Sequence, residues 1–477
     1  MVVLEELKKY VEGYDIVPIK DEIYSDFTTP LNVLRNIKSE HDKFYLLESV
    51  EQNRSGRYSY LGYDPIHTIS CKDNLVNLDG KTFKSDNPFD EIKKLLDSYK
   101  APKIENMPPF CGGLIGYAAY DSYKYFETKV EIKAKDIAKF NDYEFLLFDK
   151  VICFDSFNQK IYIIVNIKTD DLKNNYINGL NEIEKIKNLI KKTPNLTDES
   201  NEIIKNPESL DSYEEYAKKI NIVKKHIYDG DIFQCVFSRR FEGKMKGTLF
   251  NAYRALRTIN PSPYMYYYKN NDLEIAGCSP ETLVSKVGNE ITTFPIAGTR
   301  PRGKTLEEDL RLELDLRYDE KELAEHNMLV DLGRNDIGRV SKFGTVKVVE
   351  YQNILRYSHV MHIASTVKGE VLDNLKSIDV LNSILPAGTL SGAPKKRAIE
   401  IIDSLEKTKR GIYGGGLGYI DFTDNMNMCI VIRTIIKKGD DVFLQAGGGI
   451  VMDSNIESEF KETENKAMAT FKAMEEI

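Results

Sequence analysis

Hydrophobic residues recur along this chain with two different spacings, and both occur within its first 192 residues. The segments KIYIIVNIK (Lys160–Lys168) and EFLLFDKVICF (Glu144–Phe154) are rich in β-branched and aromatic residues, which predicts strands. In NYINGLNEIEKIKNLIKK (Asn175–Lys192) the apolar residues follow a helical spacing. Residues 1–192 are therefore expected to form a mixed α/β region.

A polar stretch separates this region from the rest of the chain. TPNLTDESNEIIKNPESLD (Thr193–Asp211) contains two prolines among Asn, Asp, Ser and Glu, a composition typical of a linker. We therefore expect an N-terminal region (residues 1–192), a linker (193–211) and a C-terminal region (212–477).

The C-terminal region begins with a helix signal and continues with many short apolar runs. Ser212 and Glu215 form a capping-box pattern for a helix that runs to Gly230, followed by a strand at Ile232–Phe241. Further strands are predicted at PYMYYYK, EIAGCS, EITTFPIAG, TVKVVEY, MCIVIRTIIKK and DVFLQAGGGIV. Helices are interspersed without strict alternation, which favours an α+β sheet sandwich over a doubly wound parallel sheet.

Composition narrows the classes of function. The chain has 74 acidic and 66 basic residues and a net charge of −8, which argues against a nucleic-acid partner. Its six cysteines form no CxxC pair, so a zinc or redox motif is not indicated and a reduced, cytoplasmic location is expected. Neither a signal peptide nor an apolar run of about 18 residues is present, so no membrane association is expected.

Two segments place acidic side chains three residues apart on predicted helices. Glu322 and Glu325 lie in DEKELAEHNMLVDLGRND (Asp319–Asp336), and Glu459 and Glu462 lie in ESEFKETENKA (Glu457–Ala467). Carboxylates from two such helices can hold Mg²⁺, which uses few protein ligands and leaves positions for water and substrate. The alternative is two solvated helix faces with salt bridges.

Glycine-rich segments and one arginine indicate anion binding. Gly447–Gly449 follow a predicted strand and can direct backbone N–H groups at a carboxylate, as a nest does. IYGGGLGYI (Ile412–Ile420) is a second cluster, and tight turns are the alternative for both; neither matches a dinucleotide fingerprint or a P-loop. Arg433 lies in the apolar run CIVIRTI, where burial requires an anionic partner, either an internal acid or a ligand.

Acid–base groups are few. His359 and His362 in RYSHVMHIAS would face opposite sides of a strand, so only one can face a pocket. Glu281 follows a proline at a strand end and is a candidate acid, although this signal is weak alone. Cys111 in PFCGGLIGY lacks the companion residues of an amidotransferase nucleophile and is expected to be structural.

Ten motifs occur together in an order and spacing that resemble a known family. They are GDIFQCVFSRRF, SPE, PIAGTRPRG, ELAEHNMLVDLGRND, SHVMH, PAGTLSGAPK, YGGGLGY, VIRT, QAGGGIV and ESEFKETENKA. The chain resembles chorismate-utilising enzymes, and among them the anthranilate synthase component I group, over roughly residues 22–472. The resemblance implies two packed, mainly antiparallel sheets with helices on the outside.

The resemblance also implies roles for individual residues. Glu325 and Glu462 would bind Mg²⁺, with Glu459 nearby. The acid that protonates the departing C4 hydroxyl would be Glu281, with His362 and Thr389 at the reacting face. The two carboxylates of chorismate would be bound by Gly298, Thr299, Tyr413, Arg433, Gly447, Gly448 and Gly449.

The implied reaction converts chorismate and ammonia to anthranilate and pyruvate, for tryptophan biosynthesis. Ammonia would come from a separate glutamine amidotransferase subunit in a hetero-oligomer. In relatives that make aminodeoxychorismate a lysine stands at the position of Ala297, and in isochorismate synthases a lysine stands near Gln234. Two alternatives stay open: an aminodeoxychorismate synthase component I, or a non-catalytic chorismate- or tryptophan-sensing module.

A regulatory site is implied by the same resemblance. The segment Phe44–Pro65 matches the part that binds the feedback inhibitor tryptophan, and it places Ser49 there. Pro263, Tyr264 and Met265 would complete the site from the C-terminal region. The alternative is that both stretches are ordinary strands.

Overall fold

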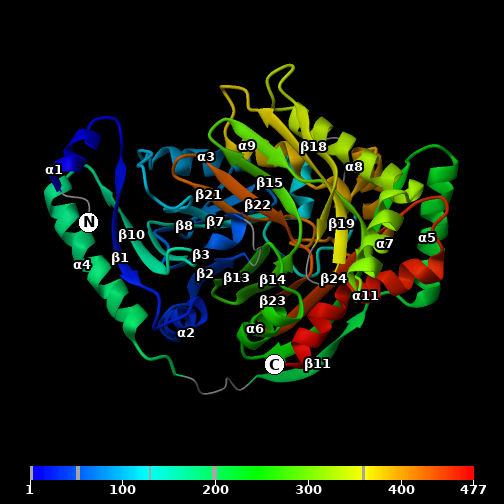
Figure 1. Cartoon of the computed structure of the whole chain (residues 1–477), viewed down its shortest axis with the longest axis horizontal. Coiled ribbons are helices and arrows are strands. Elements are labelled where there is room, and N and C mark those ends of the chain that lie inside the picture. Colours follow the sequence, from blue (N-terminus) through cyan, green and yellow to red (C-terminus); the bar gives the residue numbers. More distant parts are fainter. Residues whose placement is uncertain are drawn as a thin grey trace.

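Two antiparallel sheets packed face to face dominate the structure (Figure 1). The computed structural model describes residues 4–49, 54–127, 130, 132–195, 201–356 and 360–476. Within these residues each sheet has 12 strands.

The first sheet combines strands from both ends of the chain. Its order is β1 (Ile16–Tyr24), β10 (Lys160–Lys168), β9 (Lys150–Asp155), β3 (Tyr58–Tyr63), β2 (Lys43–Glu48), β13 (Tyr264–Asn270), β14 (Leu273–Ser279), β23 (Thr434–Lys438), β24 (Asp441–Ile450), β12 (Gln234–Lys246) and β11 (Glu202–Ser209), with β20 (Gly392–Ala393) paired to β12.

The second sheet is equally mixed. Its order is β17 (Ile296–Pro301), β19 (Val360–Glu370), β16 (Glu290–Thr293), β15 (Thr282–Val287), β22 (Met426–Ile430), β21 (Gly416–Asp421), β7 (Gly113–Ala118), β8 (Tyr143–Phe148), β4 (His67–Lys72), β5 (Leu75–Leu78) and β6 (Lys81–Lys84), with β18 (Lys347–Arg356) paired to β19.

Helices cover the outer faces of the sheets and create separate cores. The first sheet is covered by α2 (Pro30–Glu40), α4 (Leu172–Lys191), α6 (Phe250–Ile259) and α11 (Ile456–Glu475). The second sheet is covered by α3 (Pro88–Asp97), α8 (Glu320–Gly338) and α9 (Ser377–Ile384). A third core, which includes Tyr45, Tyr117 and Tyr266, lies between the sheets. The predicted α+β fold of two packed sheets with outer helices is therefore confirmed.

Smaller elements complete the chain. Helices α5 (Tyr213–Tyr228) and α10 (Lys395–Leu405) share a core with β12, and α7 (Leu306–Arg317) packs on β19. Short helical segments lie at α1 (Leu4–Leu7), η1 (Lys8–Tyr10), η2 (Arg54–Arg57), η3 (Tyr120–Tyr125) and η4 (Gly388–Leu390). Ser212 and Glu215 form the predicted capping box of α5.

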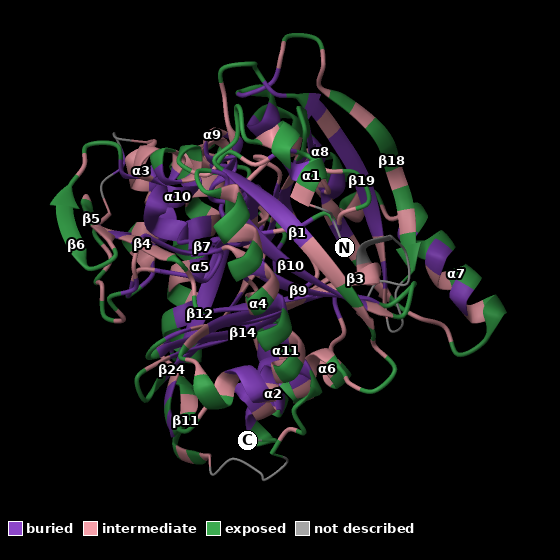
Figure 2. Cartoon of the chain, turned by 90° about the vertical axis from the view of Figure 1, so that its left-hand side faces the viewer, coloured by how far each residue is buried: buried purple, intermediate pink, exposed green. Residues whose placement is uncertain are grey.

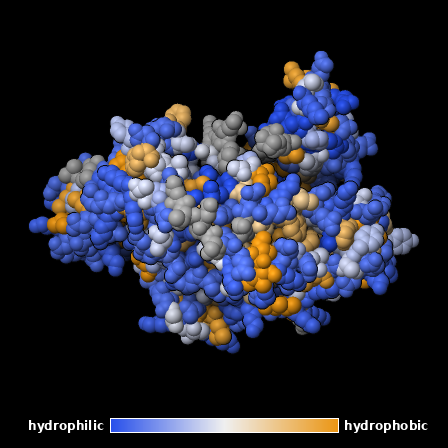
Figure 3. Space-filling view, turned by 90° about the horizontal axis from the view of Figure 1, so that it is seen from below, coloured by the Kyte–Doolittle hydropathy of each residue, from blue (hydrophilic) through white to orange (hydrophobic). Residues whose placement is uncertain are grey.

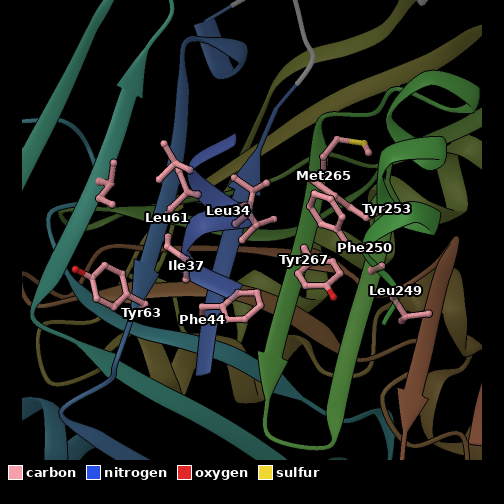
Figure 4. Close-up of a cluster of buried hydrophobic side chains, with 14 of the residues drawn as sticks. Leu34, Ile37, Phe44, Leu61, Tyr63, Leu249, Phe250, Tyr253, Met265 and Tyr267 are labelled. Atoms are coloured by element: carbon pink, nitrogen blue, oxygen red, sulfur yellow. The ribbon is translucent and has the colours of Figure 1, made fainter. Parts of the chain in front are cut away.

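The N-terminal and C-terminal regions share cores as well as sheets. In Figure 4, Leu34 and Phe44 from the N-terminal region lie in one cluster with Phe250 and Tyr267 from the C-terminal region. The expectation that residues 193–211 form a linker throughout is wrong, because β11 pairs with β12 at the edge of the first sheet. Its polar side chains are compatible with an edge strand, where most of them are exposed.

Three apolar runs that predict single strands are each divided. Residues 144–154 form β8 in one sheet and β9 in the other, and residues 290–298 form β16 and β17. Residues 428–438 cross from β22 in the second sheet to β23 in the first. An apolar run therefore does not show where a strand ends or where the chain changes sheet.

Burial follows this layering. The central strands are almost entirely buried, whereas β6 and β18 consist mostly of exposed residues (Figure 2). The face in Figure 3 is largely hydrophilic, with separate hydrophobic patches.

None of the helices in the described ranges is long and apolar enough to span a membrane. The six cysteines all lie in the described ranges and are free thiols.

Candidate active site

Two neighbouring connections between the sheets bring Glu281 and Arg433 together. Glu281 lies between β14 and β15, and Arg433 lies between β22 and β23. The Ile430 N–H donates to the Glu281 carbonyl at 3.0 Å, and the Cys278 N–H donates to the Arg433 carbonyl at 3.2 Å. Arg433 has a φ of 51°, so the prediction that it continues a strand is wrong. This left-handed conformation marks the point where the chain changes sheet.

Glu281 lies beside a small cavity that is partly open. It lines a cavity of about 40 Å³ together with Thr389, Gly388 and Leu329. Burial raises the pKa of Glu281 to about 7, although the nearby Thr389 hydroxyl and two cationic side chains lower it. A carboxyl group in such an environment is half protonated near neutral pH and can act as a general acid.

His362 lies on β19 opposite Thr299 of β17. Its Nδ1 donates to the Gly298 carbonyl at 2.9 Å and lies 3.1 Å from the Thr299 hydroxyl. Because a carbonyl only accepts, Nδ1 carries the proton and Nε2 is the basic nitrogen. Burial and the charge of Arg433 lower the pKa of His362, which favours a neutral ring. His359 lies outside the described residues.

Gly298 allows this arrangement through an irregular strand. Its φ is 68°, and the pairing of β17 with β19 shifts between Ala297 and Thr299. A β-bulge of this kind redirects neighbouring side chains and carbonyls. The segment PIAGTRPRG is therefore a bent edge strand that presents Gly298 and Thr299 to His362.

Gly447, Gly448 and Gly449 lie inside β24, paired with β12. The expected nest is wrong, since none of the three has a positive φ. A Cβ on Gly448 would lie 3.1 Å from Glu459 Oε2, and one on Gly449 would lie 2.2 Å from the Gln234 amide. Both neighbours are the ends of flexible side chains, whereas a Cβ on Gly447 would lie 2.8 Å from the backbone carbonyl oxygen of Phe237, so the backbone leaves least room at Gly447.

The acidic side chains of α8 and α11 face a common region. Burial and then repulsion by Glu322 raise the pKa of Glu325, whose Oε1 lies 3.5 Å from Gln234 Nε2. Burial raises the pKa of Glu459, with a further contribution from Glu462. The charges of Lys321 and Lys466 act on both Glu325 and Glu459. Across the described residues, however, no three Asp, Glu, His or Cys side chains lie close enough to hold a metal.

Lys466 is a site residue that sequence reasoning missed. Its Nζ lies 2.7 Å from Glu462 Oε1 and donates to the Gly447 carbonyl at 3.1 Å. Its charge also lowers the pKa of Glu281 and of Glu325. In the sequence, lysines among these glutamates resemble a solvated helix face; the spacing of four from Glu462 was the available signal.

Tyr413 is the remaining predicted substrate ligand, and it precedes β21. It is buried, and the burial raises the pKa of its hydroxyl. Its ring lies near the guanidinium of Arg410, with 5.9 Å from ring centre to Cζ.

A second, larger cavity lies between the sheets. It has a volume of about 530 Å³ and is lined by Ser49, Pro263, Tyr264 and Met265, which come from both regions of the chain. The Met265 side chain also belongs to the outer core beneath α6 (Figure 4). Thr282 and Phe294 line this cavity and the Glu281 cavity alike.

The fold and site together define an α+β protein in which the charge of Arg433 acts on both a buried carboxyl group, Glu281, and an imidazole, His362. A family model described as "chorismate binding enzyme" matches residues 42–472, and the chain belongs to this family.

Individual relatives agree over nearly full length. The chain is 43% identical to anthranilate synthase component 1 of Acetivibrio thermocellus, covering 99% of this chain and 98% of that protein. It is also 43% identical to anthranilate synthase component 1 of Aquifex aeolicus, covering 99% and 97%.

Solved structures show the same fold. The crystal structure of anthranilate synthase component I from Streptococcus pneumoniae TIGR4 has a TM-score of 0.77 and 34% identity, covering 94% of this chain and 99% of that one. The menaquinone-specific isochorismate synthase from Escherichia coli has a TM-score of 0.72 at 17% identity, which shows the fold alone.

Proposed function

We propose that this chain is the large component of a cytoplasmic anthranilate synthase, which converts chorismate and ammonia to anthranilate and pyruvate. The observation that carries the proposal is Glu281, a carboxyl group with a pKa of about 7 in a small cavity beside Thr389. The full-length similarity to proteins named anthranilate synthase component 1 supports the same reaction.

The first step needs an acid and an incoming amine. Ammonia attacks C2 of the ring, the ring double bond shifts, and the C4–O bond breaks. Glu281 gives its proton to the departing hydroxyl, which leaves as water. Ala297 and Gln234 offer neither an amine nor a base at neutral pH, which favours free ammonia as the nucleophile. The product is an aminodeoxyisochorismate.

The second step releases pyruvate. We assign to Nε2 of His362 the acceptance of the C2 proton as the C3–O bond breaks and the ring becomes aromatic. The enolpyruvyl group leaves with its oxygen and is protonated at its methylene carbon to give pyruvate. A neutral imidazole with its proton fixed on Nδ1 suits this role.

The substrate is a dianion, and its carboxylates require positive partners. We assign Arg433, Tyr413, Gly298, Thr299 and the strand that carries Gly447–Gly449 to its binding. Lys466, which sequence reasoning did not include, adds a cation beside Gly447.

We further propose Mg²⁺ as cofactor, held by Glu325 and Glu462. The fit is supported by the raised pKa values of Glu325 on α8 and Glu459 on α11. Burial raises both, and repulsion within each helix, by Glu322 and by Glu462 respectively, adds to it, so a nearby cation would relieve that repulsion. Two carboxylates are enough when water and substrate supply the other ligands. Bound there, Mg²⁺ would withdraw electrons from the ring carboxylate of chorismate.

A glutamine amidotransferase subunit would supply ammonia in a hetero-oligomer, and tryptophan would inhibit by occupying the 530 Å³ cavity. The partner is supported by the "component 1" in the names of the relatives. The inhibitor site is supported by the joint location of Ser49, Pro263 and Tyr264.

A product analysis tests the proposed function. Purified protein is incubated with chorismate, Mg²⁺ and ammonium at alkaline pH, and anthranilate is followed by fluorescence and chromatography. Release of 4-amino-4-deoxychorismate would instead identify an aminodeoxychorismate synthase. Absence of any turnover with retained chorismate binding would identify a sensing module.

A further inference from the structure

Arg410 lies between α10 and β21 and is 2% exposed. Its guanidinium forms a two-pronged ion pair with Glu406, in which Nε donates to Oε2 at 2.8 Å and Nη2 donates to Oε1 at 2.6 Å. Glu406 also accepts hydrogen bonds from the backbone N–H and hydroxyl of Ser238 on β12, at 3.0 and 2.7 Å. Both charges are thus satisfied deep inside the protein.

The remaining donors of Arg410 reach two segments that carry candidate site residues. Nη1 donates to the carbonyl of Leu390, the residue after Thr389. Nη2 donates to the carbonyl of Val236 at 2.7 Å, two residues after Gln234 on β12. One side chain therefore joins the Thr389 segment to the strand that carries Gln234.

The face of the same guanidinium packs against aromatic rings. The ring centre of Tyr413 lies 5.9 Å from its Cζ, and that of Tyr120 on η3 lies 4.5 Å away. Tyr413 is a proposed substrate ligand, and Tyr120 belongs to the N-terminal region. The contacts of Arg410 thus reach a third part of the site.

We propose that Arg410 is a positioning residue, whose planar guanidinium fixes the Thr389 segment, the Gln234 end of β12 and the Tyr413 ring relative to one another. This inference rests on the proposed function, which gives Thr389 and Tyr413 their contacts with chorismate. Lysine cannot replace Arg410. A single ammonium group cannot form the two-pronged ion pair with Glu406, reach both backbone carbonyls and stack on an aromatic ring at the same time. Replacing a buried ion pair by apolar groups is often neutral for stability, so the effect is expected in site geometry.

Two variants test the role with ammonia-dependent kinetics. Arg410→Lys keeps the positive charge but cannot form the two-pronged ion pair with Glu406. Arg410→Met combined with Glu406→Gln removes both charges, so that neither is left buried without its partner. In both, we expect kcat per folded molecule to fall at least about tenfold, because small displacements of reacting groups are costly. The KM for chorismate should change less than about threefold, because Tyr413 is the one proposed carboxylate ligand that Arg410 contacts in the described structure, whereas Arg433, Gly298 and Thr299 stay in place.

The matched control is Arg240→Lys. Like Arg410, Arg240 is a buried arginine, but it lies on β12. Its Nη1 donates to the Thr408 hydroxyl and to the Lys409 carbonyl, and its guanidinium stacks on Phe443. Its kcat should stay within about twofold of wild type.

A pH profile separates positioning from general destabilisation. In Arg410→Lys the Thr389 hydroxyl should move from Glu281, whose pKa it lowers, so the alkaline limb of kcat should shift to higher pH. An unchanged kcat per folded molecule, or a loss equal to that of Arg240→Lys, would overturn the inference. If wild type made another amine product, the proposed function would fail, and the same comparison on that product would still decide the role of Arg410.

Discussion

Glu281 is a single residue whose environment sets the pH dependence of the proposed reaction. Burial raises its pKa from 4.5 to about 7, so the protonated acid is the main form below pH 7 and is lost as pH rises through this value. We expect kcat at saturating free ammonia to fall tenfold per pH unit above about 7. Because ammonium deprotonates at alkaline pH, rates must be compared at constant free ammonia.

Glu281→Gln provides the control for this assignment. It cannot donate a proton, so turnover should be lost at every pH. The folded state favours the protonated carboxyl, so wild-type stability falls as pH rises from the unfolded pKa to about 7, and the glutamine variant should lack this loss. Thermal unfolding at pH 5 and pH 8 measures the difference. An alkaline limb that persists unchanged in a catalytically active Glu281→Gln enzyme would assign the limb to another group.

Helices α8 and α11 matter as a pair, because each contributes one proposed Mg²⁺ ligand. Glu325→Gln and Glu462→Gln should each abolish turnover and weaken Mg²⁺ binding at least about tenfold in calorimetry with substrate present. Glu457→Gln, an exposed position in the first turn of α11, is the matched control and should retain both. Normal turnover in either ligand variant would refute the metal assignment.

The elements also show what the sequence pattern can and cannot predict. Local signals sufficed for α5, whose cap residues Ser212 and Glu215 interact with each other, and for β10, whose bounds match the predicted apolar run. An apolar run does not reveal where the chain leaves one sheet for the other, so the sequence around Arg433 predicts a continuous strand where the structure has a crossing. Long-range pairing likewise gave β11 its strand conformation, since its polar sequence alone indicates a linker.

The candidate site was predictable mainly through the order of its motifs. A local pattern cannot show that Glu281 lies near Arg433, because their proximity depends on two connections between the sheets that are about 150 residues apart in sequence. Lys466 could not be separated from surface lysines without knowing that α11 faces β24. The surroundings of the β24 glycines come from β12 and α11, which are distant in sequence, so a hypothesis based on the local glycine pattern could not include them.

At the scale of the whole molecule, the two cavities share Thr282 and Phe294, which gives the proposed inhibitor tryptophan a route to Glu281. Tyr264 Oη lies 2.8 Å from the hydroxyl of Thr282, the residue after Glu281, and donates to Asn427 at 2.9 Å. Thr282 lines both cavities. A ligand in the large cavity that displaces Tyr264 would therefore disturb the connection that holds Glu281.

We therefore expect Tyr264→Phe to uncouple inhibition from binding. The tryptophan concentration for half inhibition should rise about tenfold, a coupling of about 1.4 kcal/mol, while uninhibited turnover stays within about threefold of wild type. Calorimetry should find tryptophan affinity changed less than inhibition, because most of the cavity lining is intact. Tyr58→Phe alters another tyrosine of the same cavity and should leave inhibition near normal. Equal loss of binding and inhibition in Tyr264→Phe would make Tyr264 a simple ligand contact, and unchanged inhibition would exclude the Tyr264–Thr282 contact as the route between the cavities.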